Sequence, residues 1–487
     1  MAVGSMAVFA ATLAATFLVT LIARRHARRI PDDALSSQGL NRWLIGLSAG
    51  ATSNSGFIVT AGVAMGYVHG LKWLLLPLAW LVGDLLFWRF LPGRINRYGA
   101  EVGARTITDL ILGPDRGRAK ATALLVGAIT FIGLTGYTSA QWLAGQKFVS
   151  GAFGFGPSAS LAMFALVIVA YTAIGGFRGS IYADSLQAVI RVLATVVALV
   201  AVTYIALRSP EMFGHNIAAA GADFLNPFAY GPPLIAIGAV IGFAAAALGF
   251  GLGQPQLITR YLAGRDPHET QAAWWIYLGF VHFTWLSMLV FGLLLRGLMP
   301  ELDDPETGLS VFFADHFGAI VTGVIIADIF ATIAATSNSL LVAIAQSLKF
   351  DVLLRLIPSA RRVPLAVITL LAGAVSMGVS LSGGATVLDL VLNSIGLMAA
   401  GLAPAVLVRI LGLQNTELSI ALAIVVGIAA AIAWKVVGLD GLMNQAGPGM
   451  AAGFLTNIVV ARLGAPKPGG GRMMARASEA PAGRGEG

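Results

Sequence analysis

The chain has 487 residues, of which 57% are hydrophobic and only 11% are charged, and its mean hydropathy is +0.82. Soluble domains usually carry about 25% charged residues, so this composition and the repeated apolar runs predict an all-α polytopic membrane protein. There is no cysteine, which excludes disulfides, thiolate metal sites and cysteine nucleophiles. We interpret the net charge of +8 through the basic loops, so the expected partner is the lipid bilayer and not a nucleic acid.

Thirteen apolar runs are candidates for membrane spans. The first, residues 6–23, is followed by the basic run 24–29, which is the reverse of the charge order in a signal peptide, so we keep it as a span. The predicted spans cover residues 6–23, 41–66, 72–91, 121–146, 158–176, 185–207, 233–257, 273–297, 317–347, 364–382, 385–408, 418–437 and 449–463.

Loop charges predict the orientation. The connections 92–120, 258–272 and 348–363 are basic, whereas 298–316 carries five acidic residues. Basic loops stay on the cytoplasmic side, so we expect the N-terminus outside and the C-terminus inside the bacterial inner membrane. The Gly/Pro/Ala-rich tail, 464–487, is expected to be disordered and cytoplasmic, after a transmembrane domain over 1–463.

Residues 48–56 (SAGATSNSG) interrupt the second run with small, polar and flexible residues. Such residues propagate a helix poorly, and an unpaired backbone in hydrocarbon persists only where it lines a polar cavity. We interpret this stretch as an unwound helix centre that offers carbonyls and hydroxyls to an ion and a solute. The alternative is a tight helix–helix contact through small residues.

A second interruption ends the run 233–257, where Gly249, Gly251 and Gly253 precede Gln254 and Pro255. Glycines at alternate positions and a proline disfavour a regular helix. The alternative is a helix that simply ends at the proline. Counting after the first span, the broken segments are the first and the sixth. Breaks at matching places in two five-helix halves indicate an inverted repeat with the binding site between its halves.

Four motifs in register carry a family resemblance. These are residues 47–57 (LSAGATSNSGF), 174–187 (IGGFRGSIYADSLQ), 253–261 (GQPQLITRY) and 334–341 (AATSNSLL). Together they resemble the sodium:solute symporter family, especially its proline-transporter branch. The resemblance runs from about residue 35 to about 410. It implies the leucine-transporter (LeuT) fold with a 5+5 inverted repeat over about 41–408, about 13 transmembrane helices, alternating access and ion-driven solute uptake.

The resemblance also implies a sodium site between the broken second span and the ninth span. Its carbonyl oxygens would come from Ala51, Asn54 and Thr332, and its two hydroxyl positions align with Ala335 and Thr336. One of the two hydroxyls is therefore missing. The alternative for Thr336 is a hydrogen bond to the helix backbone.

Two departures bear on the coupling ion. The aspartate of the proline branch, two residues after the Ala51 position, is Ser53 here, and Ala335 lacks an oxygen. Losing ligand oxygens weakens a site for a hard cation. Asp328 lies mid-span, two turns before Ala335, where a carboxylate is expensive. We hypothesise that Asp328 couples transport to protons in place of sodium or beside it; the alternative is a salt bridge or a place in the wall of a cytosolic cavity.

The solute cavity is expected between the two breaks, and its predicted lining is Ser55, Gly56, Phe57, Phe250, Gly251 and Gln254. The proline branch carries bulky aromatic residues near Ala247 and Gly251, so the resemblance implies more room here and a substrate other than proline. We hypothesise a small organic solute, an amino acid or a carboxylate. Asp184 and Gln187, in the family signature, are expected at the cytoplasmic start of a span, with Asp184 capping a helix and pairing at an inner gate; the alternative is contact with the substrate. Lys147, at a span end, is expected to extend to the interface; the alternative is that it attracts a carboxylate.

The sequence predicts an ion-coupled symporter with sodium or a proton as its coupling ion and no other cofactor. The alternatives are a transporter-like membrane sensor that binds solute with little flux, and a channel. An enzyme is not expected, because the six histidines are scattered without metal-ligand spacing or a nucleophile–base set. The identity of the substrate, the stoichiometry and the oligomeric state do not follow from the sequence.

Overall fold

The computed structural model describes residues 3–27, 39–115, 119–382 and 386–463 of the chain. The predicted disordered tail, 464–487, lies outside the described residues. The described part is helical, and the longer helices are α1 (Val3–Ala27), α2 (Arg42–Ser53), α5 (Leu75–Phe90), α6 (Pro92–Val102), α8 (Lys120–Phe153), α9 (Pro157–Arg208), α10 (Pro210–Ala219), α11 (Pro233–Gly253), α14 (Trp274–Leu298), α16 (Ala319–Ser347), α18 (Leu365–Leu381), α19 (Val387–Ile410), α20 (Glu417–Val436) and α21 (Ala446–Leu463).

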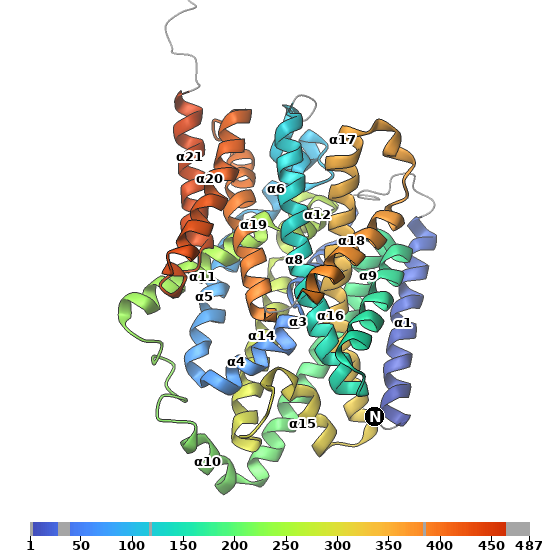
Figure 1. Cartoon of the computed structure of the whole chain (residues 1–487), viewed down its shortest axis with the longest axis vertical. Helices are drawn as coiled ribbons and strands as arrows, with labels where there is room; N and C mark the ends of the chain where they lie inside the picture. The colour runs from blue at the N-terminus through green and yellow to red at the C-terminus, as the bar shows by residue number, and fades with distance from the viewer. Residues whose placement is uncertain (1–2, 28–38, 116–118, 383–385, 464–487) are drawn as a thin grey trace, which may run out of the picture.

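Figure 1 shows a bundle in which most of the long helices run along one common direction, while α11 and α18 cross it obliquely. The N-terminal end of α1 lies at the same end as α10 and α15 (Gly308–His316), which belongs to the acidic 298–316 connection. The C-terminal end of α21 lies at the opposite end of the bundle, the end at which α6 and α17 (Leu354–Leu356), which belong to the basic connections, also lie. The basic and acidic connections therefore lie at opposite ends of the bundle, as expected if successive spans cross the membrane in alternating directions.

The first interruption is confirmed. α2 ends at Ser53, and the chain resumes as the short α3 (Gly56–Val59) and then α4 (Ala61–His69). Asn54 has φ −82° and ψ 63°, outside the helical region, and the Ser55 side chain accepts a hydrogen bond from the Phe57 N–H to start α3. The short polar residues thus supply the hydrogen bonds that a continuous helix would have made with its own backbone.

The second interruption is also confirmed. α11 ends at Gly253, Gln254 is extended with φ −96° and ψ 110°, and α12 (Pro255–Leu262) begins with the proline. Proline lacks an N–H, which costs nothing at the first position of a helix. The first broken helix packs through α2 against α9, α14 and α16, whereas α11 packs against α5 and α19.

Nine stretches of the described residues are long and apolar enough to cross a membrane, and α18 is a shorter apolar helix. Two of the nine extend over parts of two predicted spans. Pro157–Arg208, with 52 residues, would be about 78 Å long as one regular helix, far beyond the ~30 Å of bilayer hydrocarbon. It is interrupted at Gly176, whose φ of +57° suits glycine. The count of thirteen spans stays a prediction.

Candidate functional site

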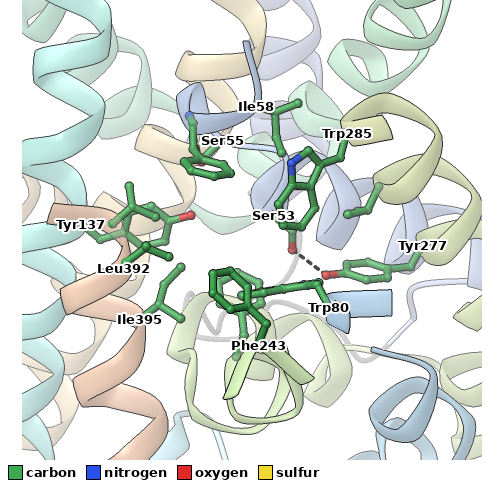
Figure 2. Close-up of a pocket in the computed structure, with 14 residues that line it drawn as sticks. Ser53, Ser55, Ile58, Trp80, Tyr137, Phe243, Tyr277, Trp285, Leu392 and Ile395 are labelled. Atoms are coloured by element: carbon green, nitrogen blue, oxygen red, sulfur yellow. Dashed lines mark hydrogen bonds between the residues drawn. The ribbon is translucent and has the colours of Figure 1, made fainter. Parts of the chain in front are cut away.

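A cavity lies where the two broken helices face each other (Figure 2). It contains about 500 Å³ of space between atoms, including its opening. Six elements contribute its walls: the first broken helix, α5, α8, α11, α14 and α19. The lining residues are Ser53, Ser55, Phe57, Ile58, Trp80, Tyr137, Phe243, Phe250, Tyr277, Val281, Trp285, Val391, Leu392 and Ile395.

Aromatic rings dominate the cavity wall. Trp80 packs edge-on against Phe250 and Trp285, with ring centroids 5.7 and 5.8 Å apart, and Trp285 also packs against Phe57 at 5.8 Å. None of the fourteen lining residues carries a charge at neutral pH. The cavity is therefore suited to a solute with an apolar body, because ring faces offer dispersion contacts and little electrostatic attraction for a full charge.

The hydroxyl groups of the cavity come from the first helix break and from tyrosines of α8 and α14. The Tyr277 hydroxyl donates a hydrogen bond to Ser53 Oγ at 3.1 Å, which in turn donates to the Ala49 carbonyl at 2.9 Å (Figure 2). The Ser55 and Tyr137 side chains also line the space. These hydroxyls and the Trp285 Nε1–H, which has no hydrogen-bond partner among the described residues, are groups that can orient a polar end of the solute.

Three of the six predicted solute residues, Ser55, Phe57 and Phe250, line the cavity, and three lie elsewhere. The Gly56 N–H donates to Gln141 Oε1 at 3.0 Å, and Gln254 Oε1 accepts from Gln256 Nε2 at 3.0 Å. Gly251 faces α5: a Cβ placed there would lie 2.5 Å from the Phe87 ring.

The expectation that small residues at Ala247 and Gly251 leave room for solute is wrong. Ala247 is fully buried, and a Cβ built on Gly83 of α5 would lie 2.7 Å from the Ala247 Cβ, so this alanine also packs against α5. The small side chains let two helices approach closely. The bulk around the cavity comes instead from Trp80 and Trp285, which motif reasoning missed because they belong to other helices.

A second, smaller pocket, with about 170 Å³ of space between atoms including its opening, is lined by four of the five predicted ion residues. Its lining is Ala51, Asn54, Gln187, Arg191, Phe280, Thr332 and Ala335. The structure thus brings the predicted ion residues of the first break and of α16 together. The fifth, Thr336, donates its hydroxyl hydrogen bond to the Thr52 carbonyl at 3.0 Å and lies 3.5 Å from the Ala51 carbonyl. Their role as cation ligands stays a prediction.

Asp328 forms an ion pair with Arg191, the salt bridge named above as its alternative. Arg191 Nη1 lies 2.5 Å from Asp328 Oδ2, and the two side chains are only 2% and 1% exposed. Its part in proton coupling stays a prediction. Sequence reasoning did not single out Arg191, although an arginine inside the predicted span 185–207 is the kind of residue that marks functional sites in membranes.

Asp184 forms a second buried ion pair, with Arg260 of α12. Arg260 Nη2 lies 2.7 Å from Asp184 Oδ2 and 2.6 Å from Ser339 Oγ, and Arg260 Nε donates to Ser48 Oγ at 2.7 Å. This network joins α2, α9, α12 and α16, so it links both broken helices to their neighbours. The pairing predicted for Asp184 is present; its role at an inner gate stays a prediction, as does the coupling role of Gln187.

One smaller expectation is corrected. Asp184 caps no helix, because the interruption of α9 falls at Gly176, eight residues earlier, and Asp184 lies within helical backbone. The Lys147 ammonium lies 3.0 Å from Asp304 and 2.6 Å from Glu306, so Lys147 attracts carboxylates of this chain, and its extension to the interface stays a prediction. Both partners lie in the acidic 298–316 connection, and their proximity to α8 could not be read from the sequence pattern.

The chain resembles known membrane transporters in sequence and in fold. The model of the sodium:solute symporter family matches residues 34–427. The osmoregulated proline transporter OpuE of Bacillus subtilis is 27% identical, with 92% of each chain covered, and the high-affinity proline transporter PutP of the same organism is 25% identical, covering 92% of this chain and 95% of PutP. A Na⁺-coupled sialic acid symporter, solved in a substrate-bound outward-open state, superposes with a TM-score of 0.80 at 19% identity, over 96% of this chain and 99% of the other.

Proposed function

Because the chain belongs to the sodium:solute symporter family, we propose that it imports a small organic solute across the cell membrane by alternating access, driven by a gradient of sodium or protons. The observation that carries the proposal is the cavity between two interrupted helices, with the small pocket beside the first interruption. Broken helices that meet at mid-membrane are the usual place for solute and coupling ion in secondary transporters. We place the transport domain over 1–463, with the inverted repeat over about 41–408.

We propose an amino acid or another carboxylate as the solute. OpuE and PutP are named for proline, and the sialic acid symporter for a sugar acid, and both of these compounds carry a carboxyl group. The aromatic wall of Trp80, Trp285 and Phe250 suits an apolar portion, and the hydroxyls of Ser53 and Ser55 suit the polar end. The absence of a charged residue among the lining residues favours a solute without net charge, such as a zwitterionic amino acid.

We propose that the basic connections face the cytoplasm, so that the end of the bundle with α6 and α17 is inside and the N-terminus is outside. The separation of these connections from the acidic 298–316 connection supports this orientation (Figure 1). Labelling of single cysteines placed in each connection by a membrane-impermeant reagent tests it, since the natural chain has no cysteine.

Uptake by proteoliposomes tests the function. The purified chain is reconstituted and offered a panel of labelled amino acids, carboxylates, sugars and nucleosides, with imposed sodium or proton gradients. We expect concentrative, saturable uptake of an amino acid or carboxylate that collapses when the driving gradient is removed. Saturable binding without concentrative uptake would instead indicate a sensor, flux without saturation a channel, and uptake of sugars or nucleosides alone would refute the proposed solute class.

A further inference from the structure

A titratable pair lies inside the bundle, apart from the residues assigned to the solute and the ion. His282 Nε2 of α14 lies 3.2 Å from Asp84 Oδ2 of α5, and the two side chains are only 7% and 1% exposed. Carboxylates and histidines are expensive to bury in a membrane-spanning bundle, and where they pair there they often carry protons. The pair therefore has a chemistry that the solute cavity and the small pocket do not use.

The pair lies directly behind the aromatic wall of the solute cavity. Three successive layers of side chains join α5 to α14: Trp80 with Trp285, whose ring centroids are 5.8 Å apart, then Asp84 with His282, then Trp88 with Tyr277, whose ring centroids are 4.4 Å apart. The first layer lines the cavity, and so does Tyr277 of the third (Figure 2). A change of charge on the pair therefore acts on the solute site from about one helical turn away.

No permanent cation balances the Asp84 carboxylate among the described residues. Its charged partner is His282, and the other titratable groups that face it are the phenols of Tyr261 in α12 and Tyr277 in α14, which are neutral at physiological pH. α11, which packs along α5, has no ionisable side chain. Ionisable side chains on the other neighbouring helices face elsewhere, among them Arg260 toward Asp184, Arg191 toward Asp328, Glu269 toward Arg42, Tyr67 toward Met299 and His69 toward Trp73.

The pair can hold one proton more or one proton fewer. His282 Nδ1 has no hydrogen-bond partner among the described residues, so this nitrogen can accept a proton. With Nδ1 unprotonated, the Nε2–H donates to the Asp84 carboxylate and the pair carries one net negative charge. When one proton from water adds to Nδ1 or, with the other imidazole tautomer, to the carboxylate, the pair has no net charge. Between aromatic layers the neutral pair is favoured, because a buried charge without a counter-charge is costly.

We propose that Asp84 and His282 together bind one proton, and that the solute binds more tightly in the neighbouring cavity when this proton is present. The cavity provides the physical link. A solute that covers Trp80 and Trp285 excludes water from the wall, and a net negative charge behind the wall then becomes more costly. The link to solute rests on the proposed function and deepens it. Neither residue lines the small pocket that contains Arg191, so a proton at the pair is compatible with sodium in that pocket.

A pH titration of tryptophan fluorescence is the direct test of proton binding, because Trp80, Trp88 and Trp285 surround the pair. The purified full chain in detergent is titrated from about pH 5 to about pH 8.5, the range around the ordinary histidine value. We expect a one-proton transition in the natural chain. The double variant Asp84→Asn, His282→Gln retains hydrogen-bonding groups but has no titratable group at either position, so the transition should be absent from it.

Matched variants separate this pair from other titrating groups and from folding. His268→Gln removes an exposed histidine and should leave the transition unchanged. Asp84→Asn and His282→Gln, made singly, should each shift the midpoint by at least about one pH unit or abolish the transition, because each removes the charged partner of the other group. A natural chain without the transition overturns the proposal, and so does a well-folded double variant that retains it. If the double variant does not fold, unshifted midpoints in the single variants overturn the proposal.

Uptake assays test the link to solute and distinguish it from the proposed function. For a solute of the panel that proteoliposomes take up, KM is measured at several external pH values with the membrane potential held constant. Above the midpoint of the transition, KM should rise by up to about tenfold per pH unit in the natural chain and vary little with pH in the double variant. A KM that is independent of pH in the natural chain overturns the link. Absence of uptake under every imposed gradient contradicts the symporter function, while the fluorescence titration still decides whether the pair binds a proton.

Discussion

Arg260 and Asp184 form a buried ion pair at 2.7 Å that joins the second half of one broken helix to the scaffold helix α9. Both side chains are at most 2% exposed, and the surrounding hydroxyls of Ser48, Ser180 and Ser339 face the same carboxylate oxygen. The pair therefore holds α12 against α9, at the place where α12 also contacts α2 and α16.

Asp184→Asn should lower stability substantially, because it leaves the Arg260 guanidinium buried without its counter-charge. Loss of one partner of a buried pair costs about 3–5 kcal/mol. We expect a lower Tm in a thermal unfolding scan in detergent. The double variant Asp184→Asn, Arg260→Gln should recover part of the loss, and Asp303→Asn, at an exposed position, should change little. Additive losses in the double variant would show that the two groups do not interact.

Trp285→Ala should weaken solute binding, because this ring connects Phe57 and Trp80 in the cavity wall. Removing a large aromatic contact from a binding site typically costs 1–2 kcal/mol or more, which corresponds to a rise in Kd or KM of about tenfold. Concentration-dependent uptake in proteoliposomes measures it. Trp43→Ala is the control, since that ring is 51% exposed and lies outside the cavity lining. An unchanged KM in Trp285→Ala would place the solute elsewhere.

Gly251→Ala should destabilise the fold, because the added methyl would lie 2.5 Å from the Phe87 ring. Forcing an extra methyl into a packed helix contact costs about 1–3 kcal/mol. The matched control is Gly279→Ala, where nothing lies within 4 Å of the added methyl and the helix propensity of alanine favours the change by up to about 1 kcal/mol. Opposite shifts in Tm are expected from the two variants; equal shifts would show that α5 and α11 are not tightly packed at Gly251.

Asp266 should make a pH-dependent contribution to stability. It accepts the Glu269 backbone N–H at 2.8 Å as the N-cap of α13 (Pro267–Ala272), and this hydrogen bond holds the pKa of its carboxyl below the ordinary value. Because the folded pKa is depressed, the contribution is present above the unfolded pKa and is lost as pH falls through the folded pKa. Asp266→Ala should therefore lower the Tm slightly at neutral pH. The difference from the natural chain should vanish in acid; a difference that persists there would mean that the charge is not involved.

Local sequence was enough to predict where two helices are interrupted. The run 48–56 and the glycines before Pro255 disfavour a helix wherever they occur, because backbone freedom and a missing N–H are properties of those residues themselves. The apolar lengths and the charges of the connections likewise predicted a polytopic membrane protein. Four motifs in order were enough to place the chain in its family.

Tertiary structure alone decided which side chains surround the cavity and which charges neutralise one another. Trp80, Tyr277 and Trp285 reach the cavity from helices whose sequences show no sign of it, and Gly251 turns toward Phe87 instead. Arg191 meets Asp328 across 137 residues of chain. Such pairings depend on how helices rotate and cross as they pack, and apolar patterns in a membrane protein constrain that rotation weakly because lipid-facing and buried surfaces are both apolar.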